Sequence, residues 1–214
     1  MTRVVCFDLD DTLVAEALFL KSGSYHISRW LHAKHPALPE LRILSCMLTA
    51  IDTRRNHYSA LERLLKEYGL SDAIDMASAV AEFRRHMPDA AIYHPAPSMI
   101  ETLDRLRNDP EVRTVLITDG RSATQRNKIK AAGLEEYFDD SDIFISEETG
   151  HDKSHPDVFL RVMEKYAGAS EFHYIGDNPP KDFLHPSRLG WHTHQVRPFP
   201  LMIHPQGMPR ERWV

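Results

Sequence analysis

Residues 1–16 read MTRVVCFDLDDTLVAE, an apolar run that leads into three aspartates within four positions. The near-continuous apolarity of residues 4–9 is typical of a strand buried on both faces of a parallel sheet. Asp8, Asp10 and Asp11 lie at its end. Like charges 4 Å apart repel by about 4 kcal/mol at an effective dielectric of 20, so a fold that gathers these carboxylates needs something that neutralises them.

Further apolar runs alternate with helical patterns along the rest of the chain. Residues 114–118 and 172–176 resemble the first strand, and residues 143–145 and 192–196 are shorter candidates. Apolar residues recur at helical spacing over 97–106, 122–132 and 156–166. Strands that alternate with helices predict an α/β fold, with a parallel sheet covered by helices on both faces.

One long segment breaks this alternation. Residues 15–94 show helical patterns and no convincing strand, and the sequence His94-Pro95-Ala96-Pro97 marks the exit from it. We therefore expect an α/β core made of residues 1–14 and 95–214, with an all-helical insert over residues 15–94. The proline-rich end of the chain, residues 197–214, is expected to lie along the surface or across an interface.

Composition excludes several classes of function. The 214 residues carry a formal net charge of −5 with a pI near 6.2, which does not favour nucleic acid as a partner. No apolar run is long enough to suggest a membrane span, and the first residues lack the layout of a signal peptide. Cys6 and Cys46 offer neither a disulfide framework nor metal-ligand spacing. A cytoplasmic protein is expected, and monomer and homodimer both stay open.

Reactive side chains follow each strong strand. Asp8 and Asp10 end the first, Thr118-Asp119-Gly120 ends the second, and a segment from Gly176 to Asp182 ends the third. Ligands of open parallel sheets bind beyond the carboxyl ends of the strands, so these groups should converge on one crevice. Residues 150–156, which carry Lys153 just before a helix, are a fourth contributor.

Four ordered elements resemble the haloacid dehalogenase-like (HAD) phosphohydrolases. They are Asp8-x-Asp10-x-Thr12, Thr118 at the end of an apolar strand, Lys153 three residues before Pro156, and Gly176-Asp177-x-x-x-x-Asp182. The core segments of the resemblance cover about 130 residues, and the helical insert matches the cap of that family only in position and helicity. The resemblance implies a Rossmann-like core with a cap domain.

The resemblance also implies a chemistry for each residue. Asp8 is the nucleophile that forms an aspartyl phosphate, and Asp10 protonates the leaving oxygen and later activates water. Mg²⁺ is the implied cofactor, with Asp8, the Asp10 backbone carbonyl and Asp177 as ligands. Asp182 is assigned to the metal site as an outer ligand that acts from behind the direct ligands or through water, or it is the partner that holds Lys153.

The phosphoryl group of the substrate also has implied partners. Lys153 neutralises the phosphoryl oxygens, and Thr118 donates a hydrogen bond to them. The backbone around Asp119 and Gly120 contributes further donors. Asp119 stands where asparagine is frequent in the family, so its carboxylate is expected to turn away or to bond locally. Ser154 stands where proline is usual.

Several alternatives stay open. The leading hypothesis is a Mg²⁺-dependent phosphatase that hydrolyses a small phosphorylated metabolite. A phosphomutase would use the same aspartates, and a HAD-type scaffold could serve binding or regulation. The dehalogenase branch is disfavoured because it typically lacks the second aspartate, and Asp10 is present. Arginines of the insert, at 54–55 and 84–85, are candidates for recognising an anionic substrate tail.

The histidines and Asp11 leave smaller questions. His192 and His194 share one face of a strand and are weak zinc candidates, with His185 or His204 as possible partners. Asp11 is expected to face solvent or to cap the following turn, and it is assigned no catalytic role.

Overall fold

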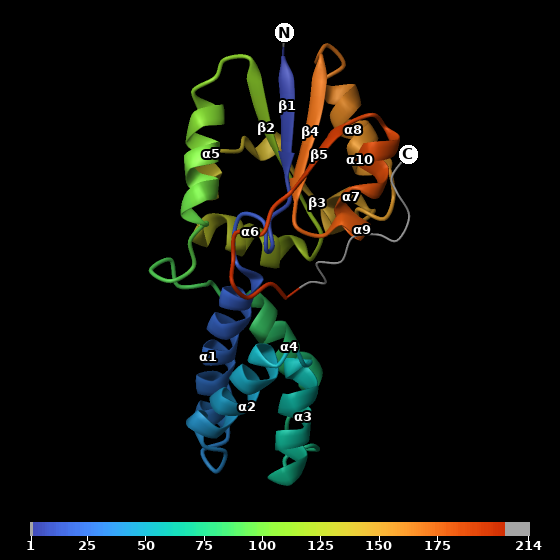
Figure 1. Ribbon diagram of the computed structural model, residues 1–214. Coiled ribbons are helices and arrows are strands. Elements are labelled where there is room, and N and C mark those ends of the chain that lie inside the picture. The colour runs from blue at the N-terminus through green and yellow to red at the C-terminus, as the bar shows by residue number, and fades with distance from the viewer. Residues whose placement is uncertain (1, 204–214) are drawn as a thin grey trace.

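The computed structural model describes residues 2–203 and is built around one parallel sheet (Figure 1). Its five strands lie in the order β3-β2-β1-β4-β5. Their bounds are β1 Arg3–Phe7, β2 Val112–Thr118, β3 Ile143–Ile145, β4 Glu171–Gly176 and β5 His192–Gln195. The first strand of the chain is thus the middle strand of the sheet, which explains its continuous apolarity.

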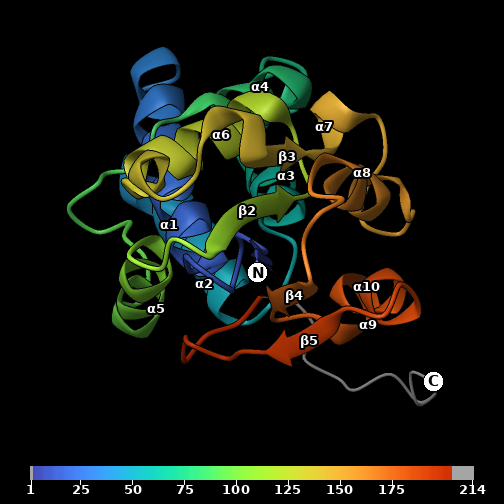
Figure 2. The same cartoon turned by 90° about the horizontal axis from the view of Figure 1, so that it is seen from above.

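Alternate side chains of β1 enter two different cores. Val5 and Phe7 belong to one hydrophobic cluster, and Val4 and Cys6 belong to the other. Helices α5 (Pro97–Arg107) and α6 (Ser122–Ala131) cover the first face, whereas α8 (Asp157–Lys165) and α10 (Leu184–Arg188) lie on the second (Figure 2). The short elements that complete the core are η1 Leu134–Glu136, η2 Asp140–Asp142, α7 Ser146–Thr149 and α9 Pro179–Asp182.

Four helices between β1 and α5 form a separate layer beyond the carboxyl ends of the strands (Figure 1). They are α1 Glu16–Lys34, α2 Glu40–Asp52, α3 His57–Glu67 and α4 Met76–Arg85. The side chains of Asn56 and Asp75 accept hydrogen bonds from backbone N–H groups of the first turns of α3 and α4, a typical start signal. We call these four helices the helical insert. The predicted α/β fold with an all-helical insert is confirmed.

The two connections between sheet and helical insert lie side by side. Val14 and Pro95 form an antiparallel bridge, and the N–H of Ala96 donates to the carbonyl of Leu13 at 3.0 Å. The insert therefore leaves and rejoins the core at one place, and the same hydrophobic cluster continues from β1 into α1 through Phe19.

The first strand is shorter than the sequence predicts. The expected strand over residues 4–9 ends at Phe7, because the chain turns there and the N–H groups of Leu13 and Val14 donate back to the carbonyl of Leu9. Asp10 therefore lies beyond the end of β1, where it forms an isolated parallel bridge with Val14. Apolarity does not reveal this turn, since Leu9, Leu13 and Val14 are all fully buried.

After β5 the chain returns toward the junction of sheet and helical insert. The N–H of Ile203 donates to a carboxylate oxygen of Asp11 at 2.6 Å, and Met202 is buried. The remainder of the proline-rich end lies outside the described residues. Among residues 2–203, no helix is long and apolar enough to cross a membrane.

Candidate active site

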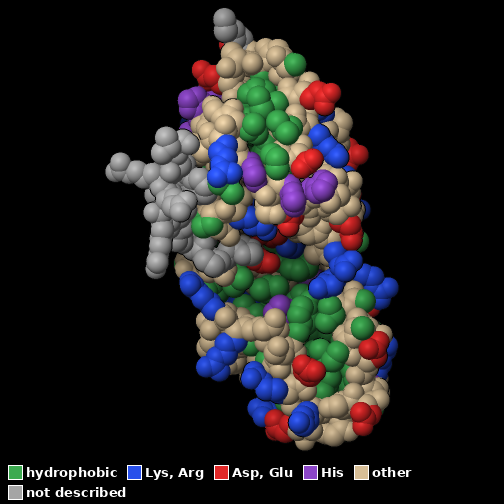
Figure 3. Space-filling model, turned by 90° about the vertical axis from the view of Figure 1, so that its right-hand side faces the viewer, with side chains coloured by type: hydrophobic (Ala, Val, Ile, Leu, Met, Phe, Trp, Pro, Cys, Tyr) green, Lys and Arg blue, Asp and Glu red, His purple; other side chains and the backbone are tan. Residues whose placement is uncertain are grey.

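The predicted site residues converge at the carboxyl edge of the sheet. Asp8 follows β1, Thr118 ends β2 and Asp177 follows β4, and all three side chains are buried. They line a cavity of about 360 Å³ between the sheet and the helical insert. In the space-filling view a hollow separates these two parts, with hydrophobic and basic side chains along its border (Figure 3).

Lys153 lies between two of the predicted carboxylates. Its Nζ is 2.6 Å from Asp8 Oδ1 and 2.6 Å from Asp182 Oδ1. Asp182 also accepts a hydrogen bond from the backbone N–H of Asn178 at 2.9 Å. Gly176 makes this packing possible, because a Cβ there would lie 2.5 Å from an Asp182 oxygen. The sequence left two roles open for Asp182, and the structure places it as a partner of Lys153.

Burial dominates the electrostatics of this cluster. Loss of hydration raises the pKa of Asp8 well above its usual range, Asp182 and Asp177 raise it further, and Lys153 opposes the change. Burial lowers the pKa of Lys153, but the charges of Asp182 and Asp8 together raise it well above its usual value. One lysine thus contacts two buried carboxylates, and the carboxylate of Asp177 lies beside them.

The positions of the Asp8, Asp177 and Asp182 carboxylates suit the binding of a hard divalent cation. One oxygen each of Asp8, Asp177 and Asp182 lie within 4.8 Å of one another. Mg²⁺ prefers oxygen ligands, and a divalent charge would stabilise carboxylates that are gathered this closely. Thr12 donates weakly to the same cluster, at 3.4 Å to Asp8 and 3.5 Å to Asp177. The donor set on this edge of the sheet is therefore the one expected for Mg²⁺.

Asp10 has partners that the sequence analysis did not find. Both of its carboxylate oxygens lie 2.7 Å from Nζ of Lys128, and Gln125 donates to one of them at 3.3 Å. Lys128 comes from the last turn of α6 and is 2% exposed. The available signal was the pattern of α6, where Thr124, Gln125 and Lys128 share the buried face with Ile129.

The segment after β2 is held by local bonds. Asp119 accepts a hydrogen bond from the backbone N–H of Lys153 at 3.1 Å and pairs with Lys181 at 2.8 Å. Its carboxylate thus bonds locally, as expected from its unusual position. Gly120 has a φ of 146°, which favours glycine, and its N–H donates to Ser146 Oγ at 2.9 Å. In this arrangement that N–H is already engaged and is not offered to a phosphate.

The helical insert supplies the opposite wall of the cavity. Its lining residues on that side are Glu16, Phe19, Leu20, His57, Tyr58, Phe83 and Arg84. Arg84 was one of the predicted candidates for an anionic tail. Arg85 instead pairs with Glu82 at 2.5 Å, and Arg54 and Arg55 do not line the cavity. The other wall residues carry no motif, and their convergence depends on how α1, α3 and α4 pack.

Among the titratable residues of this wall, His57 has the most strongly shifted pKa. Burial lowers the pKa of its imidazole to about 4, although the charge of Glu16 opposes the change. Its Nε2 is buried and has no hydrogen-bond partner among residues 2–203. The ring packs against Phe83 and Tyr58, with centroid separations of 5.0 and 4.1 Å.

The weak zinc candidates and Asp11 lie elsewhere. His194 Nε2 is 3.1 Å from His173 Nδ1, and His192 stacks on the same ring. His185 instead bonds to the backbone carbonyl of Ser154 at 2.7 Å, and His204 lies outside the described residues. Asp11 is fully buried, so it does not face solvent. It accepts a hydrogen bond from the N–H of the first residue of α1, as the capping alternative predicts.

The fold and this buried acidic edge define an α/β protein with a carboxylate-rich site at the carboxyl ends of its parallel strands. A model of the family described as haloacid dehalogenase-like hydrolase matches residues 2–184. The chain belongs to this family, and the resemblance drawn from its four motifs is confirmed.

Two phosphatases and one solved structure of this family are similar to the chain. Glyceraldehyde 3-phosphate phosphatase of Methanopyrus kandleri is 24% identical over 212 residues, covering 92% of this chain and 84% of that protein. N-acylneuraminate-9-phosphatase of Mus musculus is 27% identical over 174 residues, covering 76% and 68%. The magnesium-bound HAD-hydrolase YfnB from Bacillus subtilis shares the fold, with a TM-score of 0.60, 22% identity and coverage of 95% and 92%. These relatives place the chain among the phosphoric monoester hydrolases of its family.

Proposed function

We propose that this hydrolase is a Mg²⁺-dependent phosphatase, which hydrolyses a small phosphorylated metabolite through a phosphorylated Asp8. The observation that carries the proposal is the contact of Lys153 with Asp8 and Asp182 at the floor of the cavity. A fixed ammonium group beside a carboxylate nucleophile is the arrangement that phosphoryl transfer needs, since both the nucleophile and the phosphate are anionic.

Two displacements follow from the proposed roles. A carboxylate oxygen of Asp8 bonds to phosphorus while the bond from phosphorus to the leaving oxygen breaks, and Asp10 gives its proton to that oxygen. Asp10 then takes a proton from water, whose oxygen attacks phosphorus and releases inorganic phosphate and the Asp8 carboxylate. Lys153 and Thr118 bind the phosphoryl oxygens in both steps.

The metal is assigned to the acidic cluster. Asp8, Asp177 and Asp182 would hold Mg²⁺, together with the backbone carbonyl of Asp10. When bound, the ion supplies positive charge that offsets the phosphate and the carboxylates. The magnesium-bound relative from Bacillus subtilis supports this choice of ion.

The helical insert is proposed as a cap domain over residues 15–94, which closes on a core of residues 1–14 and 95–214. The adjoining connections at Val14 and Pro95 support a hinge at that place. A cavity of about 360 Å³ with an insert wall suits a small molecule and not a protein surface. The free thiols of Cys6 and Cys46 support the expected cytoplasmic location.

The test is phosphate release from a panel of phosphorylated sugars, glycerols and nucleotides, with Mg²⁺ or with EDTA. Asp8→Asn keeps the shape of the side chain and removes the nucleophile. Release that requires Mg²⁺ and disappears in Asp8→Asn would support the proposal. Absence of release from every compound would refute it, and an isomerised product without free phosphate would indicate a mutase. The matched control is Asp72→Asn, an exposed carboxylate outside the cavity, which should keep full activity.

A further inference from the structure

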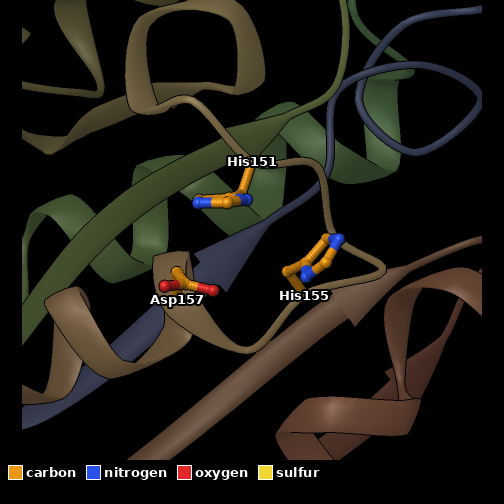
Figure 4. A group of neighbouring side chains, drawn as sticks. All are labelled: His151, His155 and Asp157. Atoms are coloured by element: carbon orange, nitrogen blue, oxygen red, sulfur yellow. The ribbon is translucent and has the colours of Figure 1, made fainter.

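A second cluster of metal-ligating side chains lies on the loop that carries Lys153. His151 and His155 come from the segment between α7 and α8, and Asp157 is the first residue of α8. One ligand atom of each lies within 4.8 Å of the others, and all three residues are exposed. Figure 4 shows the three side chains turned into the space between the loop and the start of the helix.

The backbone beneath these side chains is held in several places. Ser154 N–H donates to Asp152 Oδ1 at 3.0 Å, and His155 N–H donates to the Asp152 carbonyl at 3.0 Å. The carbonyl of Ser154 is bound by His185, and the N–H of Lys153 is bound by Asp119. Hydrogen bonds thus hold the loop backbone at Lys153, Ser154 and His155. The turn that carries the two histidines is therefore formed before any metal binds.

The side chains themselves are available for a ligand. Within residues 2–203, none of the three is joined to a protein group by a hydrogen bond or ion pair, and the two imidazoles contact each other with centroids 5.0 Å apart. By contrast, the imidazole of His173 on β4 is joined to His194 and Glu171. A solvent-facing pair of imidazoles with an adjacent carboxylate is a set of donors that no protein contact uses.

This donor set selects a class of ion. Two imidazole nitrogens and one carboxylate suit Zn²⁺, Ni²⁺, Cu²⁺ or Co²⁺, whereas Mg²⁺ prefers oxygen ligands alone. Tetrahedral Zn²⁺ with bonds of about 2.0–2.1 Å needs its ligand atoms roughly 3.3 Å apart, so the present groups have to close by no more than roughly 1.5 Å. Rotation of exposed side chains can supply this movement, and water completes the fourth position.

We propose that His151, His155 and Asp157 form a binding site for a divalent transition-metal ion such as Zn²⁺, separate from the acidic cluster of Asp8, Asp177 and Asp182. The two histidines flank Lys153 in sequence, each two residues away. Occupancy of the site ties the loop to the first turn of α8.

The experiment is calorimetric titration of the full-length, untagged protein with ZnCl₂ in the presence of excess Mg²⁺. The acidic cluster can also bind Zn²⁺, so the variants His155→Gln and Asp157→Asn are compared with Asp177→Asn. We expect one Zn²⁺ site that weakens at least tenfold in His155→Gln and in Asp157→Asn, because losing even an outer-shell partner of a metal ligand costs roughly 10–100-fold in affinity. That site should persist in Asp177→Asn.

The matched control is His192→Gln, which removes an exposed histidine from the other histidine cluster, on β5. The proposal is overturned if His155→Gln binds Zn²⁺ like the wild type, or if the site is lost in His192→Gln or only in Asp177→Asn. Anomalous diffraction from a Zn²⁺-soaked crystal gives a direct second measurement, since the peak must lie between His151 and Asp157. None of these readouts depends on phosphatase activity.

Discussion

The Nζ atom of Lys128 lies 2.7 Å from both carboxylate oxygens of Asp10, and both residues are buried. This contact joins the last turn of α6 to the segment that follows β1. Removing one partner of such a pair leaves an uncompensated charge in a place that water reaches poorly, which costs more than the pair itself contributes.

Lys128→Met should therefore destabilise the protein by about 3 kcal/mol, the lower end of the usual range for a broken buried pair. Phosphate release should fall as well, by up to ~100-fold, because an acid–base group that loses its orienting partner loses much of its contribution. Urea unfolding and a phosphate-release assay measure the two effects.

The control for Lys128→Met is Lys130→Met, which removes an exposed lysine from the same helix and should change stability by less than about 0.5 kcal/mol. In the double variant with Asp10→Asn, the second substitution removes the unpaired charge and should recover part of the lost stability. If Lys128→Met and Lys130→Met unfold alike, the contact contributes nothing to stability.

Lys153 and the metal should compensate for each other, because both neutralise the same carboxylates. Lys153→Met leaves Asp8 and Asp182 without their lysine, so added Mg²⁺ should raise the Tm of this variant more than it raises that of the wild type. Each extra kcal/mol corresponds to about 2–4 °C for a chain of this length. Thermal scans in Mg²⁺ and in EDTA measure the difference.

Lys181→Met is the appropriate comparison for Lys153→Met. Lys181 pairs with Asp119 at 2.8 Å but its side chain is 41% exposed, and Asp119 is outside the acidic cluster. Its Mg²⁺-dependent rise in Tm should match that of the wild type. Equal Tm values of Lys153→Met in Mg²⁺ and in EDTA would contradict a shared role.

The sequence predicts the sheet edge well because the information there is local. Apolar runs end at Asp8, Thr118 and Asp177, and parallel strands bring their carboxyl ends together whatever lies between them. Lys153 follows from its motif. For these residues, the strand pattern and the topology are sufficient.

Lys128 and His57 could not be placed in the same way. A lysine in an amphipathic helix usually exposes its amine, and only the rotation of α6 against the turn at Asp10 brings Lys128 inside. His57 reaches the cavity through the packing of α3 on α4, which no short pattern encodes. The early end of β1 was missed for a related reason, since Leu9, Leu13 and Val14 of the following turn are apolar and fully buried like the strand itself.

Acid should weaken the fold through His57. Burial lowers the pKa of His57 to about 4, below the value near 6.5 that it has when unfolded, so the unfolded state binds the proton more tightly. Stability is therefore complete above about pH 6.5 and is lost as the pH falls toward 4, by at most about 3 kcal/mol from this residue.

His57→Phe removes the titrating group and keeps an aromatic ring against Phe83 and Tyr58. Urea unfolding of both proteins between pH 8 and pH 4 gives the difference in free energy of unfolding. Above about pH 6.5, we expect the two free energies of unfolding to differ by a constant amount. Below that pH, the wild type should lose stability relative to His57→Phe. If the free energies of unfolding of the two proteins changed in parallel with pH over the whole range, groups other than His57 would cause the acid sensitivity.

Gly23 lies in the middle of α1, where glycine normally costs about 1 kcal/mol relative to alanine. Its replacement should nevertheless destabilise the protein, because a Cβ there would lie 2.5–2.8 Å from ring atoms of Phe83. That ring is 1% exposed and is enclosed by Phe19 and Tyr58, so it cannot move aside cheaply. Overpacking costs about 1–3 kcal/mol, which exceeds the gain in helix propensity.

The matched control for Gly23→Ala is Gly168→Ala, since nothing lies within 4 Å of a Cβ at Gly168 and its φ is not positive. We expect Gly168→Ala to be neutral or slightly stabilising and Gly23→Ala to unfold at lower urea. Phe83→Leu removes the ring atoms that clash with Ala at position 23. Phe83→Leu should therefore lower the free energy of unfolding less in the Gly23→Ala variant than in the wild type. If Gly23→Ala matched Gly168→Ala, α1 and α4 would have to pack less closely than they do here. The substrate wall that Phe83 forms would then be looser as well.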